Sequence, residues 1–150
     1  MGNSYISVYI HYIFSTKERL PLILPEIQDR LWPYIGGIAR KNNMKALAVD
    51  GMPDHIHILL SLPATISISK AVQIIKGNSS KWITERFQTS NPFSWQKGYG
   101  AFSINISILQ DTIHYIQKQA VHHRHKSFKN EYLDFLKKNE VFYDEQYVWV

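Results

Sequence analysis

Two strand-like segments, 44–50 and 55–62, constrain the fold of this chain more than any other feature of its sequence. Only four residues separate them, and Gly51, Pro53 and Asp54 are residue types that favour turns. The two segments are therefore predicted to form a β-hairpin. A hairpin is antiparallel, so an antiparallel sheet is expected around it.

The remaining elements follow from hydrophobic spacing. Alternating residues predict a strand over 6–15. Apolar residues at helical spacing predict a helix from Pro25. Pro33 weakens this second prediction, because an internal proline removes a hydrogen bond of the helix. The later elements are a helix capped by a serine (67–87), a loop (89–100), a short strand (101–106) and two further helices (107–120 and 128–138).

The order β-α-β-β-α-β-α indicates the α+β class, a ferredoxin-like or RRM-like antiparallel sheet with helices packed on one face. The other face of the sheet is expected to be free for a ligand. At 150 residues the chain has the usual size of one domain, here 1–150 with a C-terminal helix and tail.

The composition limits the chemistry and the partners. The sequence has no cysteine, which excludes disulfides, thiolate metal sites and a cysteine nucleophile, so any metal must use His, carboxylate or amide ligands. Lys and Arg number 17 against 12 Asp and Glu, and the resulting charge of +5 favours a polyanionic partner such as nucleic acid. No apolar run approaches the roughly 18 residues that cross a bilayer. A cytoplasmic, nucleoid-associated protein without a membrane partner is expected.

His55 and His57 form the most informative pair. A strand sends residues two apart to the same side, so both imidazoles are predicted to point one way, while Ile56 and Ile58 point into the core. Two imidazoles held about 6 to 7 Å apart at the backbone can chelate one metal ion. A surface pair without function is the alternative, and the tripeptide alone does not decide between them.

The helix predicted from Ser107 carries a candidate nucleophile. Ser107 and Gln110 have capping-box spacing, and four apolar residues define a buried stripe: Leu109, Ile113, Ile116 and Ala120. Tyr115 and Gln119 are four residues apart, so they are predicted to be neighbours at the edge of this stripe. A tyrosine in that position can reach over the sheet.

These motifs together resemble the single-tyrosine HUH transposases of the insertion-sequence 200/605 group, including their palindrome-associated relatives. The resemblance rests on Pro53-Asp54-His55-Ile56-His57 and on Tyr115-Ile116-Gln117-Lys118-Gln119 followed by His122-His123-Arg124. It extends over nearly the whole chain through three further segments: 14–17, 77–80 and 95–103.

The resemblance implies an activity and its residues. Tyr115 is expected to attack the scissile phosphate of single-stranded hairpin DNA and to become joined to the 5′ side of the cut. His55, His57 and Gln119 are expected to hold Mg²⁺ or Mn²⁺. A homodimer is also implied, in which the tyrosine helix of one subunit can complete the metal site of the other. The alternatives are a hairpin-binding module without turnover and a phosphoester hydrolase in which Tyr115 is structural.

The chemistry fits these residue types. A phenol has a pKa near 10 and attacks well only when its proton is removed and the phosphate is made electrophilic, which a divalent ion achieves. A phosphotyrosine ester keeps the energy of the broken bond, so rejoining needs no ATP, in agreement with the absence of a Walker-type glycine loop. Two imidazoles favour Mn²⁺ over Mg²⁺, which prefers oxygen ligands.

DNA contacts are expected on one helix and one loop. Three lysines on the outer arc of the 67–87 helix can meet phosphates, or they form an ordinary solvated face: Lys70, Lys76 and Lys81. Trp95 and Tyr99 either stack on unpaired bases or anchor their loop.

The remaining polar candidates surround the two histidines. His122 lies on the face of Tyr115 and either approaches the metal or a phosphate, or is a solvated residue at the helix end. His11 is expected to line the same face of the sheet as His55 and His57 in a structural role. Asp54 either orients an imidazole or shapes the turn, and the turn is the preferred interpretation. Three other histidines are expected to face solvent or phosphate: His114, His123 and His125.

Overall fold

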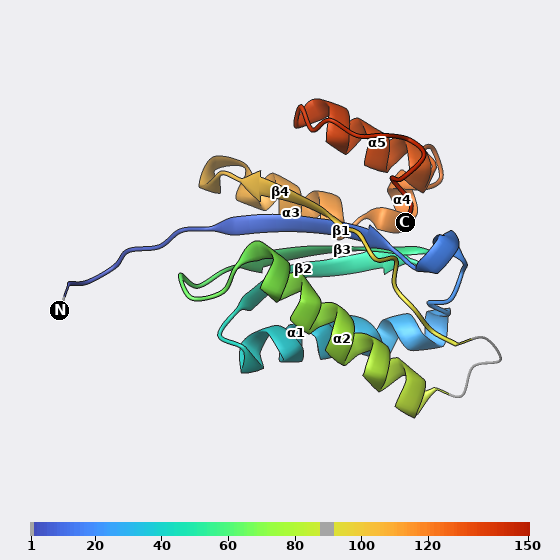
Figure 1. Cartoon of the computed structure of the whole chain (residues 1–150), viewed down its shortest axis with the longest axis horizontal. Coiled ribbons are helices and arrows are strands. Elements are labelled where there is room, and N and C mark those ends of the chain that lie inside the picture. The colour runs from blue at the N-terminus through green and yellow to red at the C-terminus, as the bar shows by residue number, and fades with distance from the viewer. Residues whose placement is uncertain (1, 88–91) are drawn as a thin grey trace.

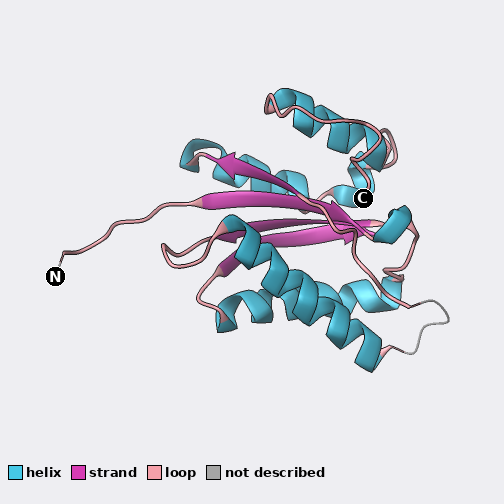
Figure 2. Ribbon diagram, viewed as in Figure 1, coloured by secondary structure: helices cyan, strands magenta, loops and turns pink. Residues whose placement is uncertain are grey.

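The structure, a computed structural model, describes residues 2–87 and 92–150 of the chain. It contains a four-stranded antiparallel sheet with the strand order β2-β3-β1-β4 (Figures 1 and 2). This order and these directions are those of a ferredoxin-like βαββαβ arrangement, which confirms the predicted fold class. The strands are β1 (Tyr9–Ser15), β2 (Lys45–Met52), β3 (His55–Ser61) and β4 (Gly100–Ile104).

The predicted hairpin is present as β2 and β3, and β1 begins later than predicted. Tyr9 pairs with both Ser61 of β3 and Ile104 of β4, and these residues are the last of their strands. Ile6 and Val8 therefore lie beyond the paired strands, where the Val8 carbonyl still accepts a hydrogen bond from the Leu62 N–H at 3.0 Å, and 50% and 39% of their surfaces are exposed. The alternation of apolar residues thus begins at residue 6, before the first residue that has partners in the sheet.

Helices α1 (Pro25–Lys41) and α2 (Ile68–Arg86) cover one face of the sheet (Figure 1). The main core lies between them and the strands, and its sheet residues alternate along β1 and β3 as predicted: Ile10, Tyr12, Phe14, Ile56, Ile58 and Leu60. The Ser67 hydroxyl accepts a hydrogen bond from the backbone N–H of Lys70 at 3.0 Å, which confirms a serine cap for α2. Helix α1 continues through Pro33 without interruption.

Three more helices lie against the opposite face: α3 (Leu109–Ile116), α4 (Gln119–His122) and α5 (Phe128–Lys138). The expectation that this face is free for a ligand is therefore wrong. Its physical reason is that the face is itself apolar, with Ile13, Leu59 and Phe102 buried under these helices. An apolar surface of this kind gains free energy when it is removed from water. The histidines of β3 consequently lie beneath a cover.

The single helix predicted from Ser107 is divided. A 3₁₀ turn (Ile106–Ile108) comes first, and its cap is Asn105, whose side chain accepts a hydrogen bond from the Ser107 backbone N–H at 2.9 Å. Ser107 is thus not the predicted cap. The helix is then interrupted between α3 and α4, and after this break Gln119 is buried while Ala120 is exposed. Ala120 therefore does not belong to the predicted buried stripe.

The prediction for α5 is confirmed at both ends, and the loop predicted over 89–100 leads into β4 as expected. Residues 89–91 of that loop lie outside the described residues. Within the described ranges, 2–87 and 92–150, no helix has the length and hydropathy needed to span a membrane.

Candidate metal centre and nucleophile

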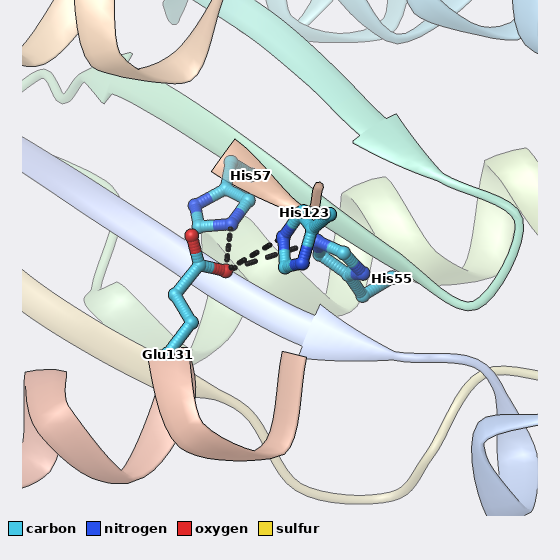
Figure 3. Close-up of side chains that lie close together, drawn as sticks. All are labelled: His55, His57, His123 and Glu131. Atoms are coloured by element: carbon cyan, nitrogen blue, oxygen red, sulfur yellow. Dashed lines mark hydrogen bonds and ion pairs between the residues drawn. The ribbon is translucent and has the colours of Figure 1, made fainter. Parts of the chain in front are cut away.

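Strand β3 fixes the positions of His55 and His57. It is paired on both sides, so that His57 lies between Ile13 of β1 and Asp50 of β2. Both imidazoles point to the face covered by α3, α4 and α5, and neither residue is exposed (Figure 3). The predicted shared orientation of the two rings is confirmed, and the alternative of a surface pair is excluded by their burial.

Each imidazole is oriented by a partner at its Nδ1 atom. Nδ1 of His57 lies 2.9 Å from Nε2 of His11, and Nδ1 of His55 lies 2.8 Å from Oδ1 of Asp54. Because the Asp54 carboxylate accepts the Nδ1–H of His55, the neutral ring keeps a free lone pair on Nε2. The preferred interpretation of Asp54 as a turn residue is therefore wrong for its side chain, which orients an imidazole; its backbone carbonyl accepts a hydrogen bond from the Thr16 N–H at 3.0 Å. His11 lines the histidine face, as expected.

Glu131 of α5 meets these rings from the other side. Its Oε1 lies 2.9 Å from Nε2 of His57, 3.3 Å from Nε2 of His123 and 3.8 Å from Nε2 of His55 (Figure 3). One ligand atom from each of these four residues falls within 4.8 Å of the others. We call His55, His57, His123 and Glu131 the His/Glu cluster.

Two members of the His/Glu cluster were missed by the sequence analysis. The expectation that His123 faces solvent or phosphate is wrong, because the turn after α4 brings its Nε2 to Glu131. Glu131 is not among the predicted site residues, although its position in the predicted helix 128–138 marks it as unusual. It lies on the buried stripe of α5 with Phe128, Tyr132 and Leu136. A carboxylate in an apolar stripe is costly to bury, and this cost marks it as a residue with a specific partner.

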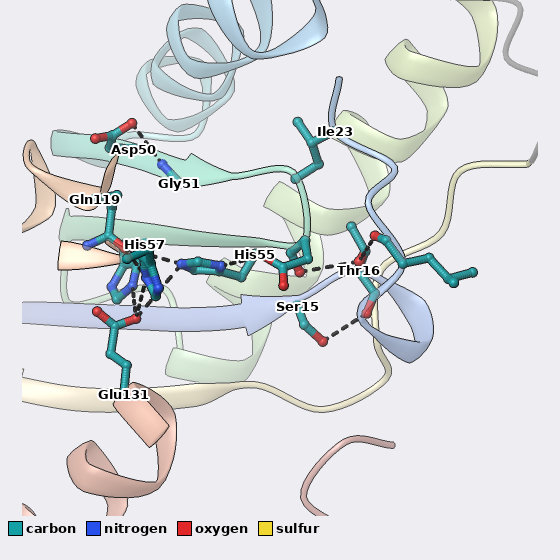
Figure 4. A network of polar contacts seen from close by, with 12 residues as sticks. Ser15, Thr16, Ile23, Asp50, Gly51, His55, His57, Gln119 and Glu131 are labelled. Carbon is teal, nitrogen blue, oxygen red and sulfur yellow. Dashed lines mark hydrogen bonds and ion pairs between the residues drawn. The ribbon is translucent and has the colours of Figure 1, made fainter. Parts of the chain in front are cut away.

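Gln119 joins the His/Glu cluster from the start of α4. Its Oε1 lies 3.2 Å from Nε2 of His55 and 3.1 Å from Nε2 of His123, and its side-chain nitrogen has no hydrogen-bond partner (Figure 4). The carbonyl oxygen of Gln119 thus lies beside Nε2 of both rings.

The donor set fits a divalent metal ion. Imidazole nitrogens, an amide oxygen and a carboxylate oxygen converge on one point, and all are ligand types used for first-row divalent metals. Burial lowers the pKa of His57 to about 4, although Glu131 acts in the opposite direction. Burial raises the pKa of Glu131, but hydrogen bonds with His123 and His57 outweigh it and hold that pKa well below its ordinary value. At neutral pH His57 and Glu131 are therefore already deprotonated, as metal ligation requires.

Tyr115 reaches the same cluster from the last turn of α3. Its hydroxyl donates a hydrogen bond to Oε2 of Glu131, the oxygen that does not face the histidines. Its ring centre lies 6.0 Å from that of His57, and its ring stacks on His122 at 4.2 Å. Burial and the contact with Glu131 raise the pKa of Tyr115 far above its ordinary value. The phenol and the paired imidazoles thus lie together within a single chain.

The predicted DNA contacts lie apart from this centre or have other roles. Lys70 and Lys81 are exposed on α2, which covers the opposite face of the sheet. Lys76 has neither of the two predicted roles, a phosphate contact or a solvated helix face. Its ammonium donates to the backbone oxygens of Gln96 and Gly98 at 2.8 and 2.6 Å, and burial lowers its pKa to about 8.

The loop aromatics and His122 are also held by the protein. Trp95 is buried, and its indole N–H donates to the Ser79 hydroxyl at 3.0 Å, so of the two predicted roles it has that of a loop anchor. Tyr99 is partly buried beside Tyr12, with ring centres 6.1 Å apart. His122 is partly buried against Tyr115 rather than solvated at a helix end.

Known proteins share this fold and sequence pattern. A family model described as "Transposase IS200 like" matches residues 4–119. The ISDra2 transposase TnpA of Deinococcus radiodurans is 31% identical over 81 residues, which are 53% of this chain and 58% of that protein. The chain therefore matches less than two thirds of the length of this relative. The transposase for insertion sequence element IS200 of Salmonella typhimurium is 27% identical over 110 residues, 69% of this chain and 72% of that protein.

Solved structures agree with the sequence matches. A crystal structure of a candidate transposase from Deinococcus radiodurans superposes with a TM-score of 0.63 at 25% identity, over 79% of this chain and 96% of the other. The structure of a REP-associated tyrosine transposase bound to a REP hairpin superposes with a TM-score of 0.60 at 19% identity, over 82% of this chain and 73% of the other, which shows a shared fold. Because the family model covers most of its length, the chain belongs to the IS200-like transposase family.

Proposed function

We propose that this protein cuts and rejoins single-stranded DNA beside a hairpin, through a covalent bond between Tyr115 and the 5′ phosphate of the cut strand. The observation that carries the proposal is the contact of Tyr115 with Glu131, which in turn contacts His57. A phenol, a carboxylate and the paired imidazoles are thus within reach of one phosphate. Membership of the IS200-like family supports the same reaction class.

The proposed step balances with these residues alone. The Tyr115 oxygen forms a bond to phosphorus and the bond from phosphorus to the 3′-oxygen breaks. The departing oxygen takes up the proton that the phenol loses, and it leaves as a hydroxyl. Oε2 of Glu131 already accepts the hydrogen bond of the phenol, so it can relay this proton from Tyr115 to the departing oxygen without keeping it. In rejoining, a 3′-hydroxyl attacks the phosphotyrosine and Tyr115 regains its proton. No ATP is consumed, because the ester conserves the energy of the original bond.

His55, His57 and Gln119 are the residues that we propose to hold the ion, with Mn²⁺ favoured over Mg²⁺ by the imidazoles. When bound, a divalent ion supplies Lewis acidity at a non-bridging phosphate oxygen and stabilises charge on the departing oxygen. His11 and Asp54 maintain the orientation of the two rings through their Nδ1 atoms. Burial of the rings excludes water from the reacting groups.

The strand can approach Tyr115 from solvent beside α5. A hollow of about 160 Å³ is lined by Tyr115, Glu131, Lys126 and Lys138, among others. Lys126 forms an ion pair with the exposed Asp134 at its rim. Lysines around an entrance attract the phosphate backbone without reading its sequence. The hairpin itself is proposed as the binding target because the REP-associated structural relative is bound to one.

The homodimer stays a proposal. A trans arrangement would exchange the tyrosine helices between subunits, as the resemblance implies. Within one chain, however, Tyr115 already contacts Glu131 of the His/Glu cluster. The cis arrangement therefore supports cleavage without an exchange, and a dimer would serve DNA binding.

The test is to incubate the protein with Mn²⁺ and a labelled single-stranded hairpin, and to look for an adduct that survives denaturation. Wild type is expected to form the adduct and Tyr115→Phe is expected to form none. Tyr34→Phe is the matched control, since Tyr34 lies on α1 and stacks on Trp82 through its ring. Equal cleavage by wild type and Tyr115→Phe would contradict the proposal. Hairpin binding without cleavage by wild type would indicate a binding module instead.

A further inference from the structure

Helix α5 lies beyond residue 119, where the match to the family model ends, yet it contributes a carboxylate to the centre. We propose that Glu131 and His123 are metal ligands alongside His55 and His57, and that the second oxygen of Glu131 positions the Tyr115 hydroxyl for attack. The part that concerns Tyr115 rests on the proposed strand transfer. The part that concerns the metal does not.

The burial of Glu131 is the first argument. Only 2% of its surface is exposed, and it lies on the apolar stripe of α5. An ionised carboxylate is tolerated there only when its charge is compensated by partners. Among the described residues its partners are His55, His57, His123 and Tyr115, all members or neighbours of the proposed centre. A purely structural carboxylate would not need four partners that converge on one point.

The second argument is the placement of the ring nitrogens around the cluster. His57 faces His11 through Nδ1, and His55 faces Asp54 through Nδ1. Ligating histidines characteristically bind an outer acceptor with one nitrogen and the metal with the other. All three Nε2 atoms then converge on Oε1 of Glu131.

The rigidity of α5 is the third argument. Its residues Phe128, Tyr132 and Leu136 pack in one buried cluster with Ile13 and Phe102 of the sheet. The ring of Phe128 is also stacked on His55, with ring centres 3.9 Å apart and planes inclined by 9°. Ligands must be held by packed elements if their geometry is to persist when the ion departs. Glu131 is fixed by this packing in the way that the strand fixes His55 and His57.

The ligand set predicts the ion. Three imidazole nitrogens, the carboxylate oxygen of Glu131 and the amide oxygen of Gln119 suit Mn²⁺ and its neighbours in the first transition row, whereas Mg²⁺ prefers an all-oxygen shell. One carboxylate then has two tasks, with Oε1 towards the ion and Oε2 towards the nucleophile. The charge on the ion and the position of the phenol are thereby linked through a single side chain.

The first experiment measures Mn²⁺ binding by calorimetry without DNA. Loss of an outer partner typically weakens metal binding about 10- to 100-fold, so loss of a direct ligand is expected to cost about 100-fold or more. Glu131→Gln and His123→Gln should show this loss. Asp134→Asn and His125→Gln are the matched controls, because both residues are exposed neighbours on the same segments. Wild-type affinity in Glu131→Gln would overturn the assignment of this ligand.

A measurement on wild type avoids any folding defect in the variants. X-ray absorption spectroscopy of the Mn²⁺-loaded protein counts imidazole ligands. Three are expected if His123 binds together with His55 and His57. A count of two would overturn the assignment of His123.

The role of Glu131 towards Tyr115 has its own test. At Mn²⁺ concentrations that saturate Glu131→Gln, adduct formation is expected to be slower than in wild type, while hairpin affinity is unchanged. Equal rates under these conditions would overturn the positioning role. If wild type binds Mn²⁺ with three imidazoles but forms no adduct, the proposed strand transfer fails and the metal site stands. If wild type forms the adduct and Glu131→Gln binds Mn²⁺ normally, only the further inference fails.

Discussion

Replacing Asp54 by alanine tests how the turn before β3 prepares His55. The substitution removes the carboxylate that accepts the Nδ1–H of His55 at 2.8 Å. It leaves the backbone contact with Thr16 in place, because that contact uses the carbonyl of Asp54. Burial raises the pKa of Asp54, but the hydrogen bond with His55 outweighs this effect and the net pKa is lowered. The interaction is therefore favourable in the folded protein.

The magnitude follows from the geometry of this contact. A hydrogen bond to a charged group contributes about 1.5 to 3 kcal/mol. The Asp54 side chain is 34% exposed, so solvent screening reduces that value and the lower end applies. About 1.4 kcal/mol corresponds to a tenfold change in a binding constant. We therefore expect Asp54→Ala to bind Mn²⁺ about tenfold more weakly than wild type.

Calorimetric titration with Mn²⁺ measures this change directly. Asp29→Ala is the matched control, since Asp29 is exposed on α1 and α1 covers the other face of the sheet. Thermal unfolding by circular dichroism, without metal, checks that both variants fold. Unchanged Mn²⁺ affinity in a folded Asp54→Ala protein would refute the reasoning, because His55 would then need no outer partner to act as a ligand.

Four other outcomes are expected. His57→Ala should abolish Mn²⁺-dependent adduct formation and retain hairpin binding in a gel-shift assay; loss of both would point to a folding defect. Gly51→Ala should lower stability by about 1 to 3 kcal/mol in urea unfolding, because a Cβ there would lie 2.3 Å from the backbone oxygen of His55; an unchanged midpoint would show that the hairpin adapts. Metal-free protein should lose about 3 kcal/mol of stability as the pH falls from about 6.5 to about 4. The pKa of His57 is about 4 in the folded protein, so the unfolded chain takes up the proton first. His57→Gln should reduce this dependence of stability on pH. A mixture of Tyr115→Phe and His57→Ala subunits should form no adduct if each centre is built in cis, whereas restored adduct would show exchange of tyrosine helices.

The sheet and the paired histidines could be predicted because strand alternation is a local property. The spacing of His55 and His57 alone fixes their shared direction, and the turn residues between β2 and β3 identify the hairpin. Helix α5 was predictable for the same reason, since its apolar stripe has regular spacing. Local patterns of this kind depend little on the rest of the chain.

The cover of the histidine face could not be predicted in this way. Its cause is tertiary, because α3, α4 and α5 return to a face whose buried residues come from three different strands, Ile13, Leu59 and Phe102. The break before Gln119 was also missed, since the spacing of Leu109, Ile113 and Ile116 continues formally to Ala120.

Glu131 and His123 were missed for a related reason. Neither is close in sequence to His55 or His57, and the contacts appear only when α5 packs on the sheet. Lys76 illustrates the opposite error. Its position on the outer arc of α2 suggested a phosphate contact, but the loop before β4 supplies carbonyl oxygens to its ammonium. Charge on a helix face therefore indicates a partner only after the neighbouring loops are placed.

The most direct measurement is to locate the DNA on the protein after cleavage. Trypsin is expected to release residues 98–118 as one peptide, with Tyr99 and Tyr115 as its two tyrosines. Tandem mass spectrometry of the digested, nuclease-treated adduct should place a phosphonucleotide on Tyr115 and leave Tyr99 unmodified. Cleaved DNA with no modified peptide, or a modification on any other residue, would contradict the proposed covalent step.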